Sequence, residues 1–299
     1  MGHGQNSHGQ LGDGSTTDKD HFSFSKLILG AKTVATGGWH SLVLTSSGTL
    51  WSAVWNRFGQ LGLGDNETRH RITFSPVLEE VQAMAAGHLH SLVLKKDRSV
   101  WAAGRNSNGQ LGDGSRVDRK RFVRVRGSDG AAVRAVAVAA GGYHSMLLTK
   151  DSRVLTTGWN MYGQLGARSP TNSDRSTFQP VFYGVKAIAA GTRHSMVLTQ
   201  DGGVWATGYN LHGELGDGST ITKNGFVEVI SGNAEAVAAG GYHSMVLKGD
   251  GSVWCTGSNE YGQIGDGSTT TRESFVRVVT LRGGAFPPHT FGDDDFFLF

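Results

Sequence analysis

The chain has 299 residues, and its 28 Lys and Arg nearly balance its 25 Asp and Glu to give a formal net charge of +3. This balance does not by itself indicate a nucleic-acid partner. Glycine contributes 45 residues, about 15% of the chain against roughly 7% in a typical protein, whereas proline contributes only 5. Because 38% of the residues are hydrophobic, including 14 Phe and 7 Trp, the chain can bury a core, which excludes wholesale disorder. So many glycines in a folded chain predict many tight turns between short strands.

Composition also excludes membrane, secretory and cysteine-based classes. No apolar run approaches the roughly 18 residues of a membrane-spanning helix, and residues 1–20 lack the apolar region of a signal peptide. The single cysteine, Cys255, rules out an intramolecular disulfide and a cysteine-based zinc cluster. We therefore expect an intracellular protein, cytoplasmic or nuclear, with no membrane association.

A repeat of about fifty residues organises the chain. The segment Asn-x-x-Gly-(Gln/Glu)-(Leu/Ile)-Gly occurs at 6–12, 56–62, 106–112, 160–166, 210–216 and 259–265, in steps of 50, 50, 54, 50 and 49 residues. A second marker, Ala-x-Gly-x-x-His-Ser, follows the same register and supplies His40, His90, His144, His194 and His243. The longer third step falls near residues 127–132, a loop by composition. Two markers in one register indicate tandem structural units.

Each repeat contains, in chain order, four predicted strands. The His-Ser pair opens an apolar run such as 91–94, which ends at a polar turn such as Asp201-Gly202, a strong hairpin signal. The return strand carries a Trp or, in one copy, Leu: Trp51, Trp101, Leu155, Trp205 and Trp254. A Gly-rich turn and a variable polar loop then lead to a Phe-led strand, at 74–78, 122–125, 178–182, 226–230 and 275–279. An Ala/Val strand such as 185–190 completes the unit and leads to the next His. Four short strands per unit predict an all-β fold and favour a β-propeller over a solenoid.

The repeated motifs resemble those of the regulator of chromosome condensation repeat family. The resemblance is carried by Ala-Ala-Gly-Gly-Tyr-His-Ser-Met-Val-Leu at 238–247, by Gly-Ser-Val-Trp at 251–254 and by the Asn-x-x-Gly-Gln-Leu-Gly turns, and it covers roughly residues 2–280. It implies a seven-bladed propeller. The namesake of the family is a chromatin-bound nucleotide exchange factor for the Ran GTPase, and relatives include ubiquitin ligases, a plant ultraviolet photoreceptor and bacterial binding proteins. The family therefore implies an architecture more firmly than a function.

The number of repeats differs from the seven that the resemblance implies. Residues 1–280 form the predicted propeller, with five complete blades at about 40–280 and a leading half-blade at 6–12. We interpret the chain as a truncated seven-bladed ring; a smaller closed ring and an open propeller are the alternatives. Residues 281–299 form a non-repeat tail, which fits either disorder or a gene-model artefact.

Residues that recur in every copy are assigned to the frame of the blade. We expect each His of the His-Ser pairs to satisfy backbone groups at a strand start rather than to bind metal. The glycines serve turn geometry, since none fits a phosphate-binding loop. Cys255 is expected to be a small buried residue, and the recurring Trp residues to lie in the core. No catalytic residue, metal ligand, cofactor or small-molecule site is predicted.

Residues that differ between copies are the candidates for binding. One variable position precedes the His and the other precedes the turn Asn, and large aromatic or Arg residues at both resemble interface anchors. Packing among the loops is the alternative. The candidate residues are Trp39, Trp55, Tyr143, Trp159, Arg193, Tyr209 and Tyr242.

A basic strip is a second candidate, formed by Arg116, Arg119, Lys120, Arg121, Arg124 and Arg126. Along 122–126 Val and Arg alternate, so Arg124 and Arg126 should face solvent while Val123 and Val125 face inward. The strip could meet phosphate groups or an acidic protein, or be a solvated face of one blade. Other blades do not continue it, so a nucleic-acid groove is not indicated.

These observations favour a non-enzymatic propeller that binds protein partners through loops on its faces. The resemblance implies a small GTPase or a chromatin protein as the kind of partner. Two alternatives rest on the resemblance alone: nucleotide exchange on a Ran-like GTPase, and a role as the propeller part of a larger ubiquitin ligase.

Overall fold

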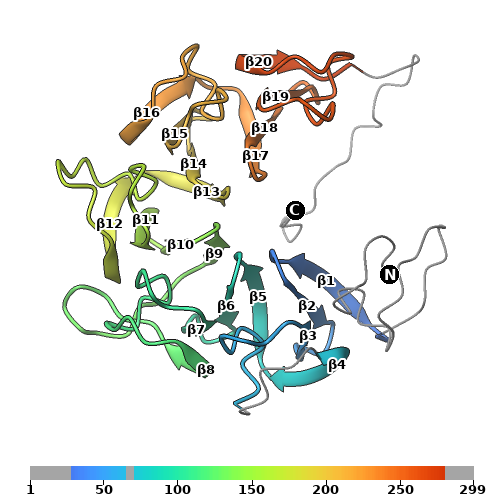
Figure 1. Ribbon diagram of the computed structural model, residues 1–299, viewed down its shortest axis with the longest axis vertical. Coiled ribbons are helices and arrows are strands. Elements are labelled where there is room, and N and C mark those ends of the chain that lie inside the picture. Colours follow the sequence, from blue (N-terminus) through green and yellow to red (C-terminus); the bar gives the residue numbers. More distant parts are fainter. Residues whose placement is uncertain (1–27, 65–70, 280–299) are drawn as a thin grey trace. The chain divides into compact units, whose positions relative to one another are not determined.

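The computed structural model describes residues 28–64 and 71–279, and every regular element within them is a β-strand (Figure 1). Twenty strands form five four-stranded antiparallel sheets in chain order. The all-β prediction and the five complete blades are thereby confirmed. The Ala/Val strand, however, opens each blade instead of completing the one before it, because it pairs with the His strand that follows, so the first blade begins at Ala31 rather than at about residue 40. The predicted half-blade at 6–12 and the tail at 281–299 lie outside the described residues.

The strands of each sheet are consecutive in the chain, and each sheet is one blade. The first blade contains β1 (Ala31–Thr36), β2 (His40–Thr45), β3 (Leu50–Val54) and β4 (Arg71–Leu78). The second contains β5 (Val81–Ala86), β6 (His90–Lys95), β7 (Val100–Gly104) and β8 (Arg119–Arg124). The third contains β9 (Ala137–Ala140), β10 (His144–Leu148), β11 (Arg153–Gly158) and β12 (Arg175–Tyr183). The fourth contains β13 (Val185–Ala190), β14 (His194–Thr199), β15 (Val204–Gly208) and β16 (Lys223–Ile230). The fifth contains β17 (Ala234–Ala239), β18 (His243–Lys248), β19 (Val253–Gly257) and β20 (Arg272–Arg277).

Two compact units divide the chain. Unit 1 comprises residues 1–150, 155–159 and 174–180, and unit 2 comprises 151–154, 160–173 and 181–299. No helix among the described residues is long and apolar enough to cross a membrane.

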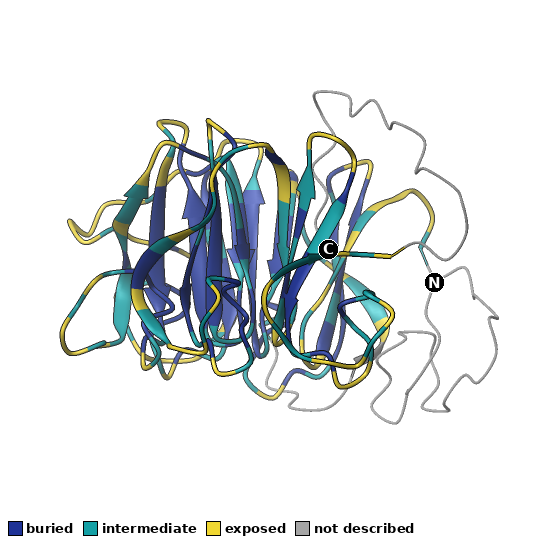
Figure 2. Ribbon diagram, turned by 90° about the horizontal axis from the view of Figure 1, so that it is seen from above, coloured by how far each residue is buried: buried dark blue, intermediate teal, exposed yellow. Residues whose placement is uncertain are grey.

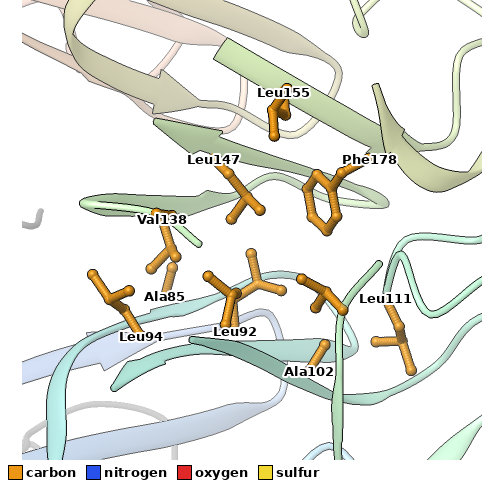
Figure 3. Close-up of a cluster of buried hydrophobic side chains, with 12 residues drawn as sticks. Ala85, Leu92, Leu94, Ala102, Leu111, Val138, Leu147, Leu155 and Phe178 are labelled. Atoms are coloured by element: carbon orange, nitrogen blue, oxygen red, sulfur yellow. The ribbon is translucent and has the colours of Figure 1, made fainter. Parts of the chain in front are cut away.

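Within each unit, the hydrophobic core lies between successive blades. In unit 1, Leu92 of β6, Leu147 of β10 and Phe178 of β12 belong to one buried cluster that joins the second and third blades (Figure 3). In unit 2, Met196 of β14 and Val246 of β18 belong to the corresponding cluster of the fourth and fifth blades. Burial follows the strands, whereas most exposed residues lie in turns and loops (Figure 2). The loops are therefore the part of the molecule that can vary without disturbing the core.

The Asn of each described turn is buried, as is the Gln or Glu of the first four blades, and these side chains build the loop. Asn106 Oδ1 accepts a hydrogen bond from the backbone N–H of Leu111 at 3.0 Å, and Gln110 Oε1 accepts one from the N–H of Asn108, also at 3.0 Å. Both bonds recur in the other described repeats, with Glu214 in the Gln position of the fourth. Because these side chains replace water around buried backbone groups, their recurrence is structural.

The repeated His and Ser pair across blades, which corrects the expected role of the His. His40 Nε2 lies 2.8 Å from Ser91 Oγ of the next blade, and His90 Nε2 lies 2.9 Å from Ser145 Oγ. Each Ser Oγ also donates to a backbone carbonyl, as Ser91 does to Gln60 O at 2.7 Å. Since the hydroxyl has one proton, the His must donate from Nε2. The His thus holds the Ser of the following blade, and the Ser satisfies the backbone; the prediction of a direct bond from His to backbone was wrong.

The recurring Trp residues are half-buried rather than in the core. Trp101 is paired across the strands with Arg124 of β8, and Trp254 with Arg277 of β20. Alternate side chains of the outermost strand of each blade face solvent. A Trp that packs beside such a side chain on the neighbouring strand therefore cannot be fully buried. Trp101 Nε1 donates to Ser99 Oγ at 2.9 Å, which satisfies the indole at this boundary. The expectation of core positions was wrong for these tryptophans, whereas Leu155 in the same slot is buried.

Candidate protein-interaction surface

The two variable positions of each blade meet through one backbone hydrogen bond. In the first blade the N–H of Trp55 donates to the carbonyl of Trp39 at 3.1 Å, and in the fourth the N–H of Tyr209 donates to the carbonyl of Arg193 at 3.0 Å. The same bond joins 105 to 89, 159 to 143 and 258 to 242. The residue before the His and the residue before the turn Asn, about fifteen positions apart, therefore form one pair at one end of each blade.

In unit 1 these pairs form an aromatic cluster with arginine. The rings of Trp39 and Trp55 lie 5.3 Å apart edge to face, and those of Tyr143 and Trp159 lie 5.7 Å apart in the same manner. The Arg105 guanidinium lies 5.3 Å from the Phe58 ring centre and 5.6 Å from that of Tyr143, within the range of cation–π attraction. We call Trp39, Trp55, Phe58, Arg105, Tyr143 and Trp159 the unit 1 cluster.

In unit 2 the cation is Arg193, and three tyrosines surround it. Its guanidinium carbon lies 5.5 Å from the ring centres of Tyr162 and Tyr209 and 5.9 Å from that of Tyr242. Tyr162 and Tyr209 lie 4.9 Å apart edge to face, and the His212 ring is 5.9 Å from Tyr242. We call Tyr162, Arg193, Tyr209, His212 and Tyr242 the Arg193 cluster.

Within each cluster the side chains pack against one another, yet they remain accessible to solvent. Trp39 is 40% exposed and Tyr242 is 39% exposed, and the other predicted members are half-buried. Met161 and Leu211, which precede Tyr162 and His212 in the chain, are 63% and 59% exposed. All seven predicted candidates thus lie in the clusters, where the rings pack against each other as the packing alternative predicts. They also leave apolar and cationic surface exposed, and partner binding there stays a prediction.

The sequence interpretation missed a third variable position. Phe58, Tyr162 and His212 all occupy the second x of Asn-x-x-Gly, and each contributes a ring to a cluster. His88 was also missed; it stacks on Tyr143 at 5.4 Å. The available signal was the aromatic content of a variable position inside an otherwise constant motif.

The basic strip is largely engaged with its own chain. Arg119 Nε donates to Asp113 Oδ2 at 2.6 Å, and the same ion pair recurs as Lys223–Asp217 and Arg272–Asp266, so Arg119 belongs to the loop frame. Arg126 Nη1 donates to the carbonyl of Gly130 at 2.8 Å, and the Arg121 side chain covers Gly64.

The rest of the strip offers little free charge. Arg116 lies 4.0 Å from Asp174, whereas Lys120 and Arg124 are exposed. Val125 is buried and Val123 is half-buried, so the predicted alternation holds. A partner site on this strip stays a prediction, now with less available charge than six residues suggested.

Glu214 replaces the turn Gln beneath the Arg193 cluster. The side chain is fully buried; Oε2 accepts the N–H of His212 at 2.9 Å, and Oε1 is a buried oxygen without a hydrogen-bond partner. Burial raises the pKa of the Glu214 carboxyl, while its hydrogen bonds and Arg193 act in the opposite direction. Burial and Glu214 together raise the pKa of Tyr209. Arg193 and Glu214 are thus electrostatically coupled through a common neighbour.

Glu214→Gln is expected to stabilise the protein by about 1 kcal/mol or more at pH 7, because it removes a buried charge. The other described repeats have Gln in this position, so the amide fits the loop. Since the pKa of Glu214 is raised above its usual 4.5, the gain should be full at neutral pH and vanish as the pH falls below about 4.5. Urea unfolding of both proteins at each pH measures it; equal stability at pH 7 would contradict the assignment.

Nucleophile and metal sites receive no support from the geometry. Burial raises the pKa of the Cys255 thiol to about 11, and the side chain is fully buried, as predicted. No group of three or more His, Cys, Asp or Glu capable of holding a metal ion occurs in the part of the chain that the structure describes.

Comparisons with known proteins agree with this architecture. The model of the RCC1-like domain family matches residues 1–291. Among solved structures, human WBSCR16 aligns with a TM-score of 0.74 and 22% identity, over 84% of this chain and 67% of that one. Prp20p of Saccharomyces cerevisiae, described with its binding to Gsp1p and histones, aligns with a TM-score of 0.69 and 22% identity, over 85% and 66%. The chain thus spans about two thirds of the length of either structure. A search of curated proteins found no match.

Proposed function

The chain belongs to the RCC1-like domain family, a family of β-propellers, and from that premise we propose that it binds protein partners through the loops that carry the two clusters. The observation that carries the proposal is the backbone bond that brings both variable positions of each blade together. Partly exposed Trp, Tyr and Arg side chains on a rigid frame are the residues that most often dominate binding energy. Partners of the type named for Prp20p, a Gsp1p-like protein or a histone, are the first to test.

The proposal includes a non-enzymatic role. Four serines of the His–Ser motifs, Ser91, Ser145, Ser195 and Ser244, are buried, and each donates its hydroxyl proton to a backbone carbonyl, as Ser244 Oγ does to the carbonyl of Glu214 at 2.7 Å. A nucleophile needs access to substrate and a base that can remove its proton, and the His here donates to the Ser instead. The proposal also includes an intracellular location, cytoplasmic or nuclear, which imaging of the tagged protein would test.

Nucleotide exchange and a place in a ubiquitin ligase stay predictions from the resemblance. The four-residue insertion in the third repeat step forms a tight turn in which the N–H of Gly127 bonds to the carbonyl of Ala131 at 2.8 Å. Such a closed turn is unlike a projecting wedge, so no observation favours exchange over simple binding.

Replacing cluster residues by those of sister repeats should remove partner binding without unfolding the protein. We expect Trp39→Leu with Trp55→Ser, and separately Tyr209→Ser with Tyr242→Leu, each to weaken at least one partner by about tenfold or more, since anchor residues contribute about 2 kcal/mol or more. Leu89 and Ser258 already occupy these positions in other blades. The measurement is quantitative affinity capture from cell extract, followed by Kd determination with each purified partner.

The matched control is Tyr183→Ser, because Tyr183 of β12 is 63% exposed but belongs to neither cluster. The proposal requires that partners lost with a cluster variant are retained by this control. Identical capture by the native protein and both cluster variants would refute it, as would equal loss with Tyr183→Ser.

A further inference from the structure

Arg193 is a cation enclosed by rings and without an ion-pair contact among the described residues. Among the described residues no carboxylate lies within 4.0 Å of its guanidinium, and its Nε is a buried donor without a hydrogen-bond partner. The three tyrosine rings stabilise the charge by cation–π attraction but do not satisfy its N–H groups. In contrast, Arg105 of unit 1 has an acceptor, because its Nε donates to Ser107 Oγ at 3.0 Å.

The position of Arg193 is occupied in the sister repeats by uncharged residues, namely Trp39, Leu89, Tyr143 and Tyr242. The blade therefore does not need a cation there. Nor does Arg193 stabilise its surroundings as half of an ion pair, since its Coulomb partner Glu214 is not in ion-pair contact. A guanidinium held among three rings is pre-organised, so little side-chain entropy is lost when its N–H groups meet an acceptor.

We propose that the Arg193 cluster is the recognition site for a carboxylate side chain of an acidic peptide segment in a protein partner. This inference rests on the proposed protein-binding function and specifies its chemistry. The planar guanidinium can pair with a carboxylate through two parallel N–H···O bonds. The exposed Met161 and Leu211 beside the cluster supply apolar surface for residues flanking the acidic one.

The charge of the cluster favours a carboxylate over a phosphate. Phosphate recognition by proteins usually gathers several arginines around about two negative charges. Here one guanidinium acts, and the field of Glu214 offsets part of its charge. A carboxylate, with one negative charge, therefore matches the single partly offset charge of Arg193 better than a phosphate does.

The test uses a fluorescein-labelled deca-glutamate peptide and the full chain, with fluorescence anisotropy at low ionic strength. Arg193→Tyr, which copies the residue of the third and fifth blades, should weaken binding by about tenfold or more, because charged hydrogen bonds contribute that much. Arg193→Lys should recover only part of it, since an ammonium lacks the planar fork. Glu214→Gln should tighten binding by about two- to fivefold, because it removes a competing carboxylate near Arg193.

Three controls separate the outcomes. Arg124→Gln in the basic strip should leave the affinity unchanged; a loss equal to that of Arg193→Tyr would show unspecific attraction and overturn the proposal. Inorganic phosphate at the same charge concentration should compete weakly, and displacement of the peptide by phosphate at equal charge would reassign the site to phosphate. Unchanged binding in Arg193→Tyr would also overturn the proposal. If Arg193→Tyr loses a captured protein although the native protein does not bind the glutamate peptide, the protein-binding function stands and the acidic-peptide chemistry falls.

Discussion

Lowering the pH from 7 to 5 is expected to remove about 5 kcal/mol of folding free energy, a large part of the 5–15 kcal/mol that holds a typical protein folded. The cause is a row of buried histidines, of which His40 and His90 bond to the Ser of the next blade. Burial lowers the pKa of His40 and His90 to about 3 and that of His144 to about 4; nearby His88 adds to the effect at His40, and His40, His144 and His88 add to it at His90. Each side chain is at most 2% exposed.

The sign follows from which state takes up the proton. In the unfolded chain these histidines titrate near 6.5, whereas in the folded protein they stay neutral to about pH 4. Their stabilising effect is therefore complete above about pH 6.5 and is lost as the pH falls, at about 1.4 kcal/mol per pH unit for each histidine. A carboxyl such as Asp266, whose pKa is lowered to about 2, acts only below its unfolded value of 3.8 and so in a separate window.

Urea unfolding between pH 8 and 5 measures this dependence. At pH 5.5 the unfolding reaction should take up close to three protons from this row. His90→Asn keeps a hydrogen-bond donor but cannot titrate, so its proton uptake should drop by about one while its stability at pH 8 falls. A flat stability profile from pH 7 to 5 would mean that these imidazoles take up no protons on unfolding, which would contradict the lowering of their pKa by burial.

Recurrence in the sequence predicted the blades well because a constant frame repeats at a constant step. Recurrence could not predict the hydrogen-bond partner of each His. The repeat length is the same whether His40 bonds to Ser41 of its own blade or to Ser91 of the next. The same applies to Trp101. The sequence shows that a Trp recurs at this position of the repeat, but its burial depends on the neighbouring strand β8, which faces solvent.

The binding candidates were found for the opposite reason, because they vary. The sequence could not predict which of these candidates contact one another. Trp39 and Trp55 lie in separate motifs, and a backbone hydrogen bond that leaves no trace in the side-chain pattern joins them. Tyr162 was missed because a variable position within a motif reads as a spacer, although Phe58, Tyr162 and His212 each contribute a ring from that position.

Gly112→Ala is expected to cost about 3–4 kcal/mol, and the reason explains much of the glycine content. Gly112 closes the Gly-Gln-Leu-Gly turn with φ of +65°, and a Cβ there would lie 2.5 Å from Phe178 Cδ2 and 3.1 Å from Thr157 Cγ2. The aromatic ring that leads the last strand of the next blade thus rests on the bare glycine, and Phe178 is 1% exposed. Gly62 and Gly166 seat Phe122 and Phe226 in the same way.

Gly114→Ala is the matched control, because it separates backbone strain from packing. Gly114 has φ of +88°, but its nearest neighbour would be Thr177 Cγ2 at 3.9 Å. This substitution should therefore cost only the strain of a left-handed residue, about 1–2 kcal/mol. The further 1–3 kcal/mol at Gly112 is overpacking against Phe178.

A second substitution tests that origin directly. Combining Gly112→Ala with Phe178→Leu should make the double variant more stable than the sum of the single losses predicts, by about 1 kcal/mol or more, since the smaller side chain makes room for the methyl group. Chemical unfolding of the four proteins completes the cycle. Equal costs at Gly112 and Gly114, or strictly additive losses, would show that the turn needs glycine for its backbone alone. In that event the contact between blades would not explain why glycine recurs there, and the variable loops would owe their fixed positions to the Asn and Gln hydrogen bonds only.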